Sequence, residues 1–361
     1  MTNTAELRPK NQSKTAENRF WGDLGGNPLE MLIPPVLSSP DVADMPFTKD
    51  PRHRISECPS SLRQKANTSA WFRSRFVEDV KLFMDLDDID PANWIEHMTY
   101  YELPFGYRQE NKTVVDLMIR TLKNPDIFGP SVTEDPRRQC VRCAVVGSGG
   151  VMKGSKRGTE IDAHDYVFRV NRAHIQEKFA EDVGQKISFY SFYPESHHRQ
   201  DPNLAVSDSL QLYIPFKSFD IDYMAAWLAE RRIVTLVTKS SRHNFPLNPN
   251  VNETTVKVLH PDFIRYAFSR YLNTSRAFRP TTVFLTVILA LQLCDHVSVY
   301  GFGYDARFPL YYFDDPMHWT IEGMKKSFHN HMDEQNTWKT LHEEGIIYWY
   351  NGQNETLDIF T

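Results

Sequence analysis

The chain of 361 residues is long enough for one large domain or for two domains of ordinary size. Its formal net charge of −5 gives no general electrostatic attraction for nucleic acid or for an anionic membrane surface. Hydrophobic residues make up 41% of the chain and aromatic residues 13%, so the composition excludes wholesale disorder and predicts a real core.

The first part of the chain differs in composition from the rest. Residues 1–55 are rich in proline, asparagine, serine and threonine and hold no long periodic segment, so we interpret them as a stem or linker. They contain no apolar signal-peptide core, and no stretch of the chain reaches the roughly 18 to 20 apolar residues that a membrane span needs. We therefore predict one folded domain over residues 56–361.

Strands and helices are predicted to alternate along this domain. The apolar run at 143–149 stops at glycines, which is typical of a buried parallel strand that leads into a turn. Such alternation predicts an α/β fold with a Rossmann-like, mostly parallel twisted sheet flanked by helices, whose ligands lie at the carboxyl ends of the strands. Further strands are expected at 166–170, 187–192, 210–214, 233–238, 296–300 and 346–350, and helices within 68–125, 263–272, 281–294 and 319–345.

The cysteines and the sequons bear on the cellular compartment. Four cysteines permit two disulfides in three possible pairings. Cys140-x-x-Cys143 could instead form half of a zinc site, but no second close pair of Cys or His accompanies it. The sequon Asn-x-Ser/Thr occurs six times, where chance would give roughly two or three, and this excess favours a secretory lumen over polar loop triplets. The sequons are at Asn11, Asn67, Asn111, Asn252, Asn273 and Asn354.

Two short segments could bind an anion or a sugar. The turn Gly147-Ser148-Gly149 follows a strand and is expected to expose backbone N–H groups to a phosphate, although a tight structural turn is the alternative. The dinucleotide pattern G-x-G-x-x-G is incomplete because Met152 occupies its sixth position. The alternative hypothesis of a nicotinamide-dependent oxidoreductase is therefore supported by this turn alone. Asn171 offers both a donor and an acceptor, which suits a phosphate or a sugar, or the local backbone.

Four segments in the same order resemble the motifs of the animal-type sialyltransferases, glycosyltransferase family 29. Residues 143–184 resemble the large sialylmotif and residues 260–303 the small one. The region around Tyr311-Tyr312 is similar to the third motif, and residues 329–334 fit the very small motif H-x4-E. The resemblance implies the GT-A-like variant of the Rossmann-like fold. It also implies a type II membrane anchor upstream of this sequence and a Golgi lumenal location, or secretion where no anchor is present.

Within that family the sequence resembles two groups of enzymes. CPSSLRQ at 58–64, LPFGYRQ at 103–109, RPTT at 279–282 and WKTLHEEGII at 338–347 are similar to enzymes that sialylate O-linked N-acetylgalactosamine in an α2,6 linkage. YPES at 193–196, PFKSFD at 215–220 and YGFGYD at 300–305 resemble α2,3 enzymes that act on galactose. The implied reaction moves N-acetylneuraminic acid from CMP-N-acetylneuraminic acid to a glycan hydroxyl with inversion. A catalytically silent glycan-binding protein on the same fold is a further alternative.

The resemblance also implies roles for individual residues. His329 aligns with the proposed catalytic base, and an imidazole suits that role because its ordinary pKa lies near neutral pH. Glu334 would orient the loop or hydrogen-bond the imidazole, whereas His331 is expected to point elsewhere. Either Tyr311 or Tyr312 would contact the phosphate or sugar of the donor. The implied CMP-binding residues are Gly147, Ser148, Asn171, Thr281, Thr282, Gly301 and Gly303.

The same resemblance implies two disulfides and the glycan sites of a lumenal glycoprotein. Cys143 with Cys294 matches the pair that joins the two sialylmotifs, which leaves Cys58 with Cys140. Two positions depart from the family pattern: Ser148 stands where asparagine is usual, and Val283 stands where glycine is usual, which adds bulk where backbone access is expected. The implied N-glycosylation sites are Asn67, Asn111, Asn252, Asn273 and Asn354.

No metal and no cofactor other than the donor substrate are expected. The leaving group is a nucleoside monophosphate, whose charge neutral donors and backbone N–H groups can balance. The Asp-x-Asp pairs at 85–87, 88–90 and 220–222 are interpreted as solvated helix or turn residues. The expected partners are the nucleotide sugar and a glycoprotein or glycolipid acceptor, with no nucleic acid.

Overall fold

In the computed structural model, no described helix combines the length and the apolar character that a membrane span requires.

The predicted glycan sites Asn273 and Asn354 lie outside the described residues. The described residues are 45–123, 126–128, 140–171, 173–197, 209–238, 241–245, 247, 250–272, 278–303, 305, 307–313 and 329–352.

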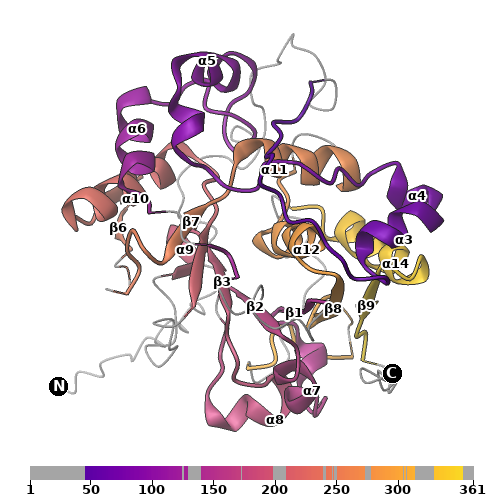
Figure 1. Cartoon of the computed structure of the whole chain (residues 1–361). Coiled ribbons are helices and arrows are strands. Elements are labelled where there is room, and N and C mark those ends of the chain that lie inside the picture. The colour runs from indigo at the N-terminus through magenta and orange to yellow at the C-terminus, as the bar shows by residue number, and fades with distance from the viewer. Residues whose placement is uncertain are drawn as a thin grey trace, which may run out of the picture.

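A fully parallel sheet of seven strands forms the centre of the fold and confirms the predicted α/β class (Figure 1). The strand order is β7-β4-β3-β2-β1-β8-β9. The segment predicted at 233–238 contains a strand, but it pairs in a separate antiparallel hairpin, β5 (Thr235–Val237) with β6 (Arg242–Asn244). The strands of the main sheet are β1 (Arg142–Val146), β2 (Tyr166–Val170), β3 (Phe189–Phe192), β4 (Leu210–Tyr213), β7 (Val256–Val258), β8 (His296–Tyr300) and β9 (Ile347–Trp349).

Helices flank the sheet on both faces. The region predicted as helical at 68–125 forms several short helices rather than a continuous one, and Asp90 caps a new helix whose first residue is Pro91. The helices are α3 (Leu62–Thr68), α4 (Ala70–Arg73), η1 (Leu86–Ile89), α5 (Pro91–Tyr100), α6 (Lys112–Thr121), η3 (Gly150–Met152), α7 (Gly158–Asp162), η4 (Glu177–Phe179), α8 (Ala180–Val183), α9 (Pro194–His197), α10 (Ser218–Glu230), α11 (Pro261–Ala267), η5 (Phe268–Leu272), α12 (Thr282–Leu293) and α14 (His331–Glu343).

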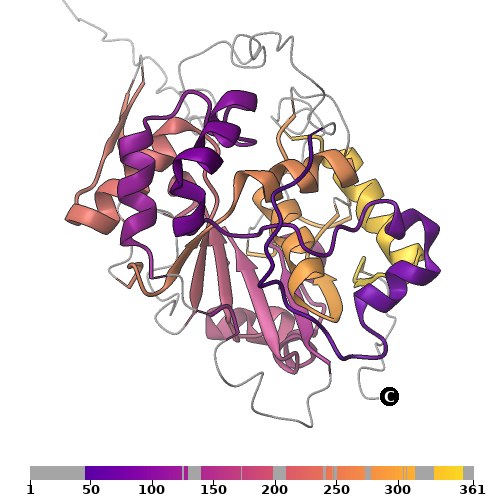
Figure 2. The same ribbon diagram turned by 45° about the horizontal axis from the view of Figure 1, so that its top comes forward.

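Alternate residues of each strand enter cores on opposite faces of the sheet. Val145 packs on the face that is covered by the apolar helix α12, whereas Val146 packs with residues of α7 and α8. On that second face, α6 and α10 cover the far end of the sheet over β3, β4 and β7 (Figures 1 and 2). Because α12 precedes β8 and packs beneath β1, β2, β3 and β8, its N-terminus lies at the carboxyl edge of the sheet.

Candidate functional site

The glycines that follow β1 and β8 meet at the carboxyl edge of the sheet. The Gly147 N–H donates to the Tyr300 carbonyl at 2.8 Å, and the Gly149 N–H donates to the Gly301 carbonyl at 3.0 Å. A Cβ added at Gly149 would lie 2.5 Å from the Gly301 oxygen. These two N–H groups therefore join the turns to each other, whereas the sequence had predicted that they would face a phosphate.

A cavity of about 160 Å³ opens beside these turns. Gly303, at φ +90°, lies against it, and a Cβ there would approach a ring carbon of Trp349 to 2.9 Å. The Trp349 Nε1–H donates to the Phe302 carbonyl at 3.2 Å, which fixes the indole at the end of β9. The lining residues are Val151, Phe302, Gly303, Asp305, Arg307, Gln335, Trp349 and Asn351.

Asn171 directly follows β2 at the same edge and adopts a left-handed backbone conformation, with φ +49°. Its N–H donates to the Ser191 carbonyl at 3.1 Å, and its own carbonyl accepts from the Tyr190 hydroxyl. Its side-chain Oδ1 is buried and has no hydrogen-bond partner among the described residues. Buried polar atoms are normally paired, so this oxygen is suited to a ligand or an ordered water.

The two tyrosines of the third motif have different environments. Tyr312 is buried, and its hydroxyl donates to the His174 carbonyl at 2.6 Å while accepting from the His174 N–H at 2.9 Å. The Tyr312 N–H donates to the Ser148 carbonyl at 3.1 Å, and Tyr311 forms a β-bridge with Gly149. Tyr311 is only partly buried. Of the two, Tyr311 is therefore the more accessible from solvent.

The N-terminus of α12 is built by Thr281 and Glu334. The Thr281 hydroxyl accepts from the Phe284 N–H at 2.9 Å, as an N-cap does, and donates to Glu334 Oε2 at 2.7 Å. The Thr281 N–H donates to Glu334 Oε1 at 2.8 Å. Thr282 and Val283 occupy the first turn, where backbone N–H groups have no acceptor within the helix, so an anion would be stabilised there.

Glu334 acts on α12 rather than on the imidazole. Both carboxyl oxygens contact Thr281, and no hydrogen bond to His329 is present among the described residues. Burial raises the pKa of Glu334 to about 8, although the two hydrogen bonds from Thr281 oppose that rise. The group therefore positions the N-terminus of α12.

His329 is held by a backbone carbonyl that the sequence did not indicate. Its Nδ1 lies 2.8 Å from the carbonyl oxygen of Arg279, and a carbonyl only accepts, so Nδ1 carries the proton. The neutral ring then presents the Nε2 lone pair. Burial lowers the pKa of His329, and the Arg279 guanidinium adds to the lowering while the hydrogen bond to the carbonyl opposes it. The ring therefore remains an unprotonated base near neutral pH.

His331 lies beside His329, which corrects the expectation that it would point elsewhere. The two ring centroids are 5.8 Å apart. His331 begins α14 directly after the cap Asn330, and this turn brings the rings to the same side. Burial and the neighbouring His329 lower the pKa of His331 to about 4, so the pair contributes two neutral imidazoles.

Both predicted disulfides are present. Cys143 pairs with Cys294, which links β1 to the C-terminal end of α12, and Cys58 pairs with Cys140. The described glycan sites lie at the surface to different degrees. Asn67 and Asn111 are exposed and Asn252 is partly exposed, although the Asn111 and Asn252 side chains also hold local turns.

The Asp-x-Asp residues differ in burial: Asp87, Asp90 and Asp222 are exposed, as predicted, whereas Asp88 and Asp220 are not. Asp220 is fully buried, where Lys217 Nζ contacts Oδ1 at 2.7 Å and the Phe216 N–H contacts Oδ2 at 2.8 Å. Asp88 is also buried and accepts from Lys81 Nζ at 2.7 Å. These carboxylates already have cationic or N–H partners, so they serve the fold.

Asp88, His97 and His260 form a buried group with the composition of a metal site. The hydrogen bonds of His260, however, leave it no ring nitrogen for a metal ion. His260 Nδ1 accepts from the Asp262 N–H at 3.1 Å, so a neutral ring has its proton on Nε2, which faces Asp88 at 3.2 Å. That nitrogen then has no lone pair for a cation. His260 and Lys81 hold the pKa of Asp88 below its usual value against the opposing effect of burial.

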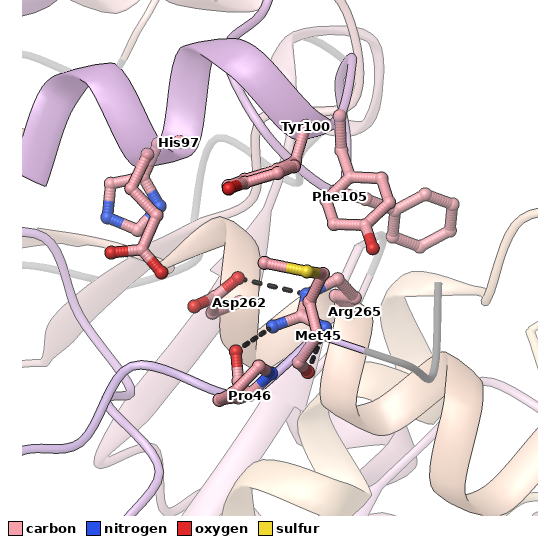
Figure 3. Close-up of a pocket in the computed structure, with 9 residues that line it drawn as sticks. Met45, Pro46, His97, Tyr100, Phe105, Asp262 and Arg265 are labelled. Atoms are coloured by element: carbon pink, nitrogen blue, oxygen red, sulfur yellow. Dashed lines mark hydrogen bonds and ion pairs between the residues drawn. The ribbon is translucent and has the colours of Figure 1, made fainter. Parts of the chain in front are cut away.

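A small cavity of about 10 Å³ lies between α5, α11 and the chain at Met45 and Pro46 (Figure 3). Arg265 lines this cavity: it donates to the carbonyls of Met45 and Pro46 at 2.8 and 2.7 Å, and to Asp262 Oδ1 at 3.0 Å. Arg54, also within the predicted linker, pairs with Asp295 at 2.8 Å. The end of that segment is thus attached to the domain, and the cavity has room for one water molecule.

Comparison with known proteins identifies the family of this chain. The family model described as "Glycosyltransferase family 29 (sialyltransferase)" matches residues 83–346. A human alpha-N-acetylgalactosaminide alpha-2,6-sialyltransferase 1 is 32% identical over 320 residues, which are 81% of this chain and 52% of that protein. The human enzyme 2 of that name is 31% identical over 77% of this chain and 78% of its own length. The chain thus spans about half the length of the first of these relatives.

Proteins with other printed specificities are also similar. A human CMP-N-acetylneuraminate-beta-galactosamide-alpha-2,3-sialyltransferase 1 is 30% identical over 71% of each chain. The solved structure of a mammalian sialyltransferase superposes with a TM-score of 0.63 at 26% identity, covering 83% of this chain and all of the other. A second structure, of a mammalian sialyltransferase in complex with Gal-beta-1-3GalNAc-ortho-nitrophenol, has a TM-score of 0.60.

Proposed function

Because this chain belongs to glycosyltransferase family 29, the sialyltransferases, we propose that it transfers N-acetylneuraminic acid from the CMP-activated sugar to a glycan hydroxyl with inversion. The observation that carries this proposal is the His329 tautomer, in which Nδ1–H donates to the Arg279 carbonyl and Nε2 carries the basic lone pair. The N-terminus of α12 lies beside this base, because Glu334 ties Thr281 to the first turn of α14, which starts two residues after His329.

The reaction on this proposal is a single displacement. The acceptor oxygen forms a bond to the anomeric carbon while the bond from that carbon to the phosphate oxygen of CMP breaks, and the bonding electrons leave with CMP. The acceptor's proton passes to Nε2 of His329. General base assistance of this kind contributes about 10²- to 10⁴-fold in rate.

The donor would lie along the carboxyl edge of the sheet. The backbone N–H groups of Thr282 and Val283, which have no acceptor within the helix, suit the phosphate, and the buried Oδ1 of Asn171 suits a hydroxyl or amine of the nucleoside. Tyr311 and the cavity at Gly303 would also contact CMP. Tyr312 would not touch the donor, but it would hold the neighbouring backbone at His174. Since a monophosphate is balanced by such groups, we propose that transfer needs no metal ion.

The acceptor is inferred from the relatives. Two of those similar to this chain carry the name alpha-N-acetylgalactosaminide alpha-2,6-sialyltransferase, so we propose O-linked N-acetylgalactosamine on a glycoprotein and an α2,6 linkage. The second candidate is α2,3 transfer to galactose, favoured by the relative of that name and by the structure bound to a galactose-containing disaccharide. A glycolipid acceptor is consistent with either.

We also propose a lumenal Golgi setting and a domain that starts near residue 45. The two disulfides and the exposed sequon at Asn67 support an oxidising, glycosylating compartment. The contacts of Met45 and Pro46 with Arg265 support the boundary, with the preceding residues as a stem. A membrane anchor upstream, or secretion, fits this setting.

His329→Ala tests the proposal. We expect transfer to fall about 10²- to 10⁴-fold while CMP binding stays within about twofold, because the imidazole acts on the acceptor proton. Radiolabelled donor and an array of N-acetylgalactosamine- and galactose-ending acceptors would report rate and linkage. His243→Ala, in the β5–β6 hairpin, is the matched control. Near-normal turnover in His329→Ala would remove this base, and CMP binding without turnover on any acceptor would favour a silent glycan-binding protein.

A further inference from the structure

Arg279 contributes two groups to the site, a backbone carbonyl and a guanidinium. Its carbonyl holds Nδ1 of His329 at 2.8 Å. Its guanidinium also lies close enough to lower the pKa of that imidazole. A positive charge next to a base makes the base weaker while the site is empty. We therefore expect the guanidinium to bind an anionic group of the substrate.

The guanidinium has no carboxylate partner within the described part of the chain. Its one hydrogen bond there runs from Nη1 to the Phe216 carbonyl at 3.3 Å. Asp220 attracts it electrostatically, but Lys217 Nζ and the Phe216 N–H already occupy the two oxygens of that carboxylate. Arg279 as a whole residue is exposed, although the protein around its guanidinium lowers the pKa of that group, so the cation lies at the edge of the site and not in open solvent.

The donor of the proposed reaction has an anion at the required place. N-acetylneuraminic acid bears a carboxylate directly on its anomeric carbon, which is the atom that the acceptor oxygen attacks. Since His329 must reach the proton on that oxygen, a cation beside His329 lies near the carboxylate as well. A guanidinium binds a carboxylate through two parallel hydrogen bonds, which also fixes its orientation.

We propose that the Arg279 guanidinium binds the carboxylate of a sialic acid in the reaction site, namely that of the donor. This inference rests on the proposed function and adds a binding residue to it. Lys217 and Asp220 are positioning residues, because together they hold the Phe216 peptide that accepts from Arg279. Once the carboxylate is bound, its negative charge offsets the guanidinium, and His329 becomes a stronger base when the donor is in place.

The test compares two ligands that differ by the sialic acid. Calorimetry would measure the dissociation constants of CMP and of the unreactive CMP-3-fluoro-N-acetylneuraminic acid for the wild type, Arg279→Gln and Arg279→Lys. We expect Arg279→Gln to weaken the fluoro analogue about tenfold or more and CMP less than about twofold, since a hydrogen bond to a charged group is lost. Arg279→Lys should recover part of the loss. Arg232→Gln, an exposed arginine that pairs with Glu230, is the matched control.

Kinetics with two acceptors identify the source of the carboxylate. If the KM of a sialylated acceptor rises in Arg279→Gln while donor binding and the KM of a neutral acceptor stay unchanged, the carboxylate belongs to the acceptor and the donor assignment is overturned. Equal weakening of CMP and the fluoro analogue, or no weakening of either, overturns the carboxylate role altogether. Failure of the proposed function looks different, because the wild type itself would then bind no CMP or turn over no acceptor.

Discussion

The two ends of helix α12 are fixed by different means and respond to pH in opposite directions. At the C-terminal end, Cys294 is bonded to Cys143, and Asp295 accepts from Arg54 and from the Val141 N–H. These partners keep the pKa of Asp295 below its usual value, although burial acts the other way. At the N-terminal end, burial raises the pKa of Glu334 to about 8. The C-terminal end, which is remote from the proposed reaction site, is thus held by a disulfide bond. The N-terminal end, at that site, is held by the hydrogen bonds between Thr281 and the Glu334 carboxyl group, which can be protonated.

Breaking the covalent end should have the largest effect on stability. The bond between Cys143 and Cys294 spans 151 residues of sequence, for which the chain-entropy model gives about 5 kcal/mol. We expect Cys143→Ser with Cys294→Ser to lower the free energy of unfolding by that order, as measured by urea denaturation. The pair Cys58→Ser with Cys140→Ser, at a separation of 82, is the control. A larger loss of unfolding free energy in the control would contradict this ranking, because the shorter loop predicts the smaller effect.

Glu334→Gln should remove the pH dependence of stability that the Glu334 carboxyl group causes at the N-terminal end of α12. The unfolded glutamate titrates near about 4.3, so between there and about pH 8 the folded state binds the extra proton. Through this group, the free energy of unfolding of the wild type therefore falls by about 1.4 kcal/mol for each unit by which the pH rises within that window. Glutamine keeps an acceptor for Thr281 without the charge. The free energy of unfolding of the variant should thus gain on the wild type as pH rises from 5 to 8.

Asp295→Asn is the matched control for that pH series and has the opposite sign. The folded pKa of Asp295 is depressed, so its contribution is present at neutral pH and is lost as pH falls below about 4. The loss caused by Asp295→Asn should be greatest at neutral pH and should shrink in acid. Parallel pH profiles for the two variants would contradict the contrast between the ends of α12.

The sequence predicted the covalent end of α12 better than the catalytic end. Apolar runs that stop at glycines or polar residues mark β1 and β8 locally, and resemblance to the family supplied the disulfide pairs. The contact between Glu334 and Thr281 joins residues 53 positions apart, which no local pattern records. Arg279 holds His329 through a carbonyl, a group that every residue has. Such contacts depend on how whole elements pack, so they appear only in the fold.

The smallest expected effect concerns Val283, at the second position of α12. Its side chain is partly buried and packs against the core cluster beneath the helix, so its extra bulk relative to glycine is directed at the protein. Val283→Gly should therefore change the CMP dissociation constant by less than about threefold, while glycine in a helix costs about 1 kcal/mol in stability. Val283→Ala removes most of the same side chain without the backbone freedom of glycine. If both variants tighten CMP binding about tenfold or more, the valine obstructs the donor pocket, and its departure from the family pattern weakens donor affinity.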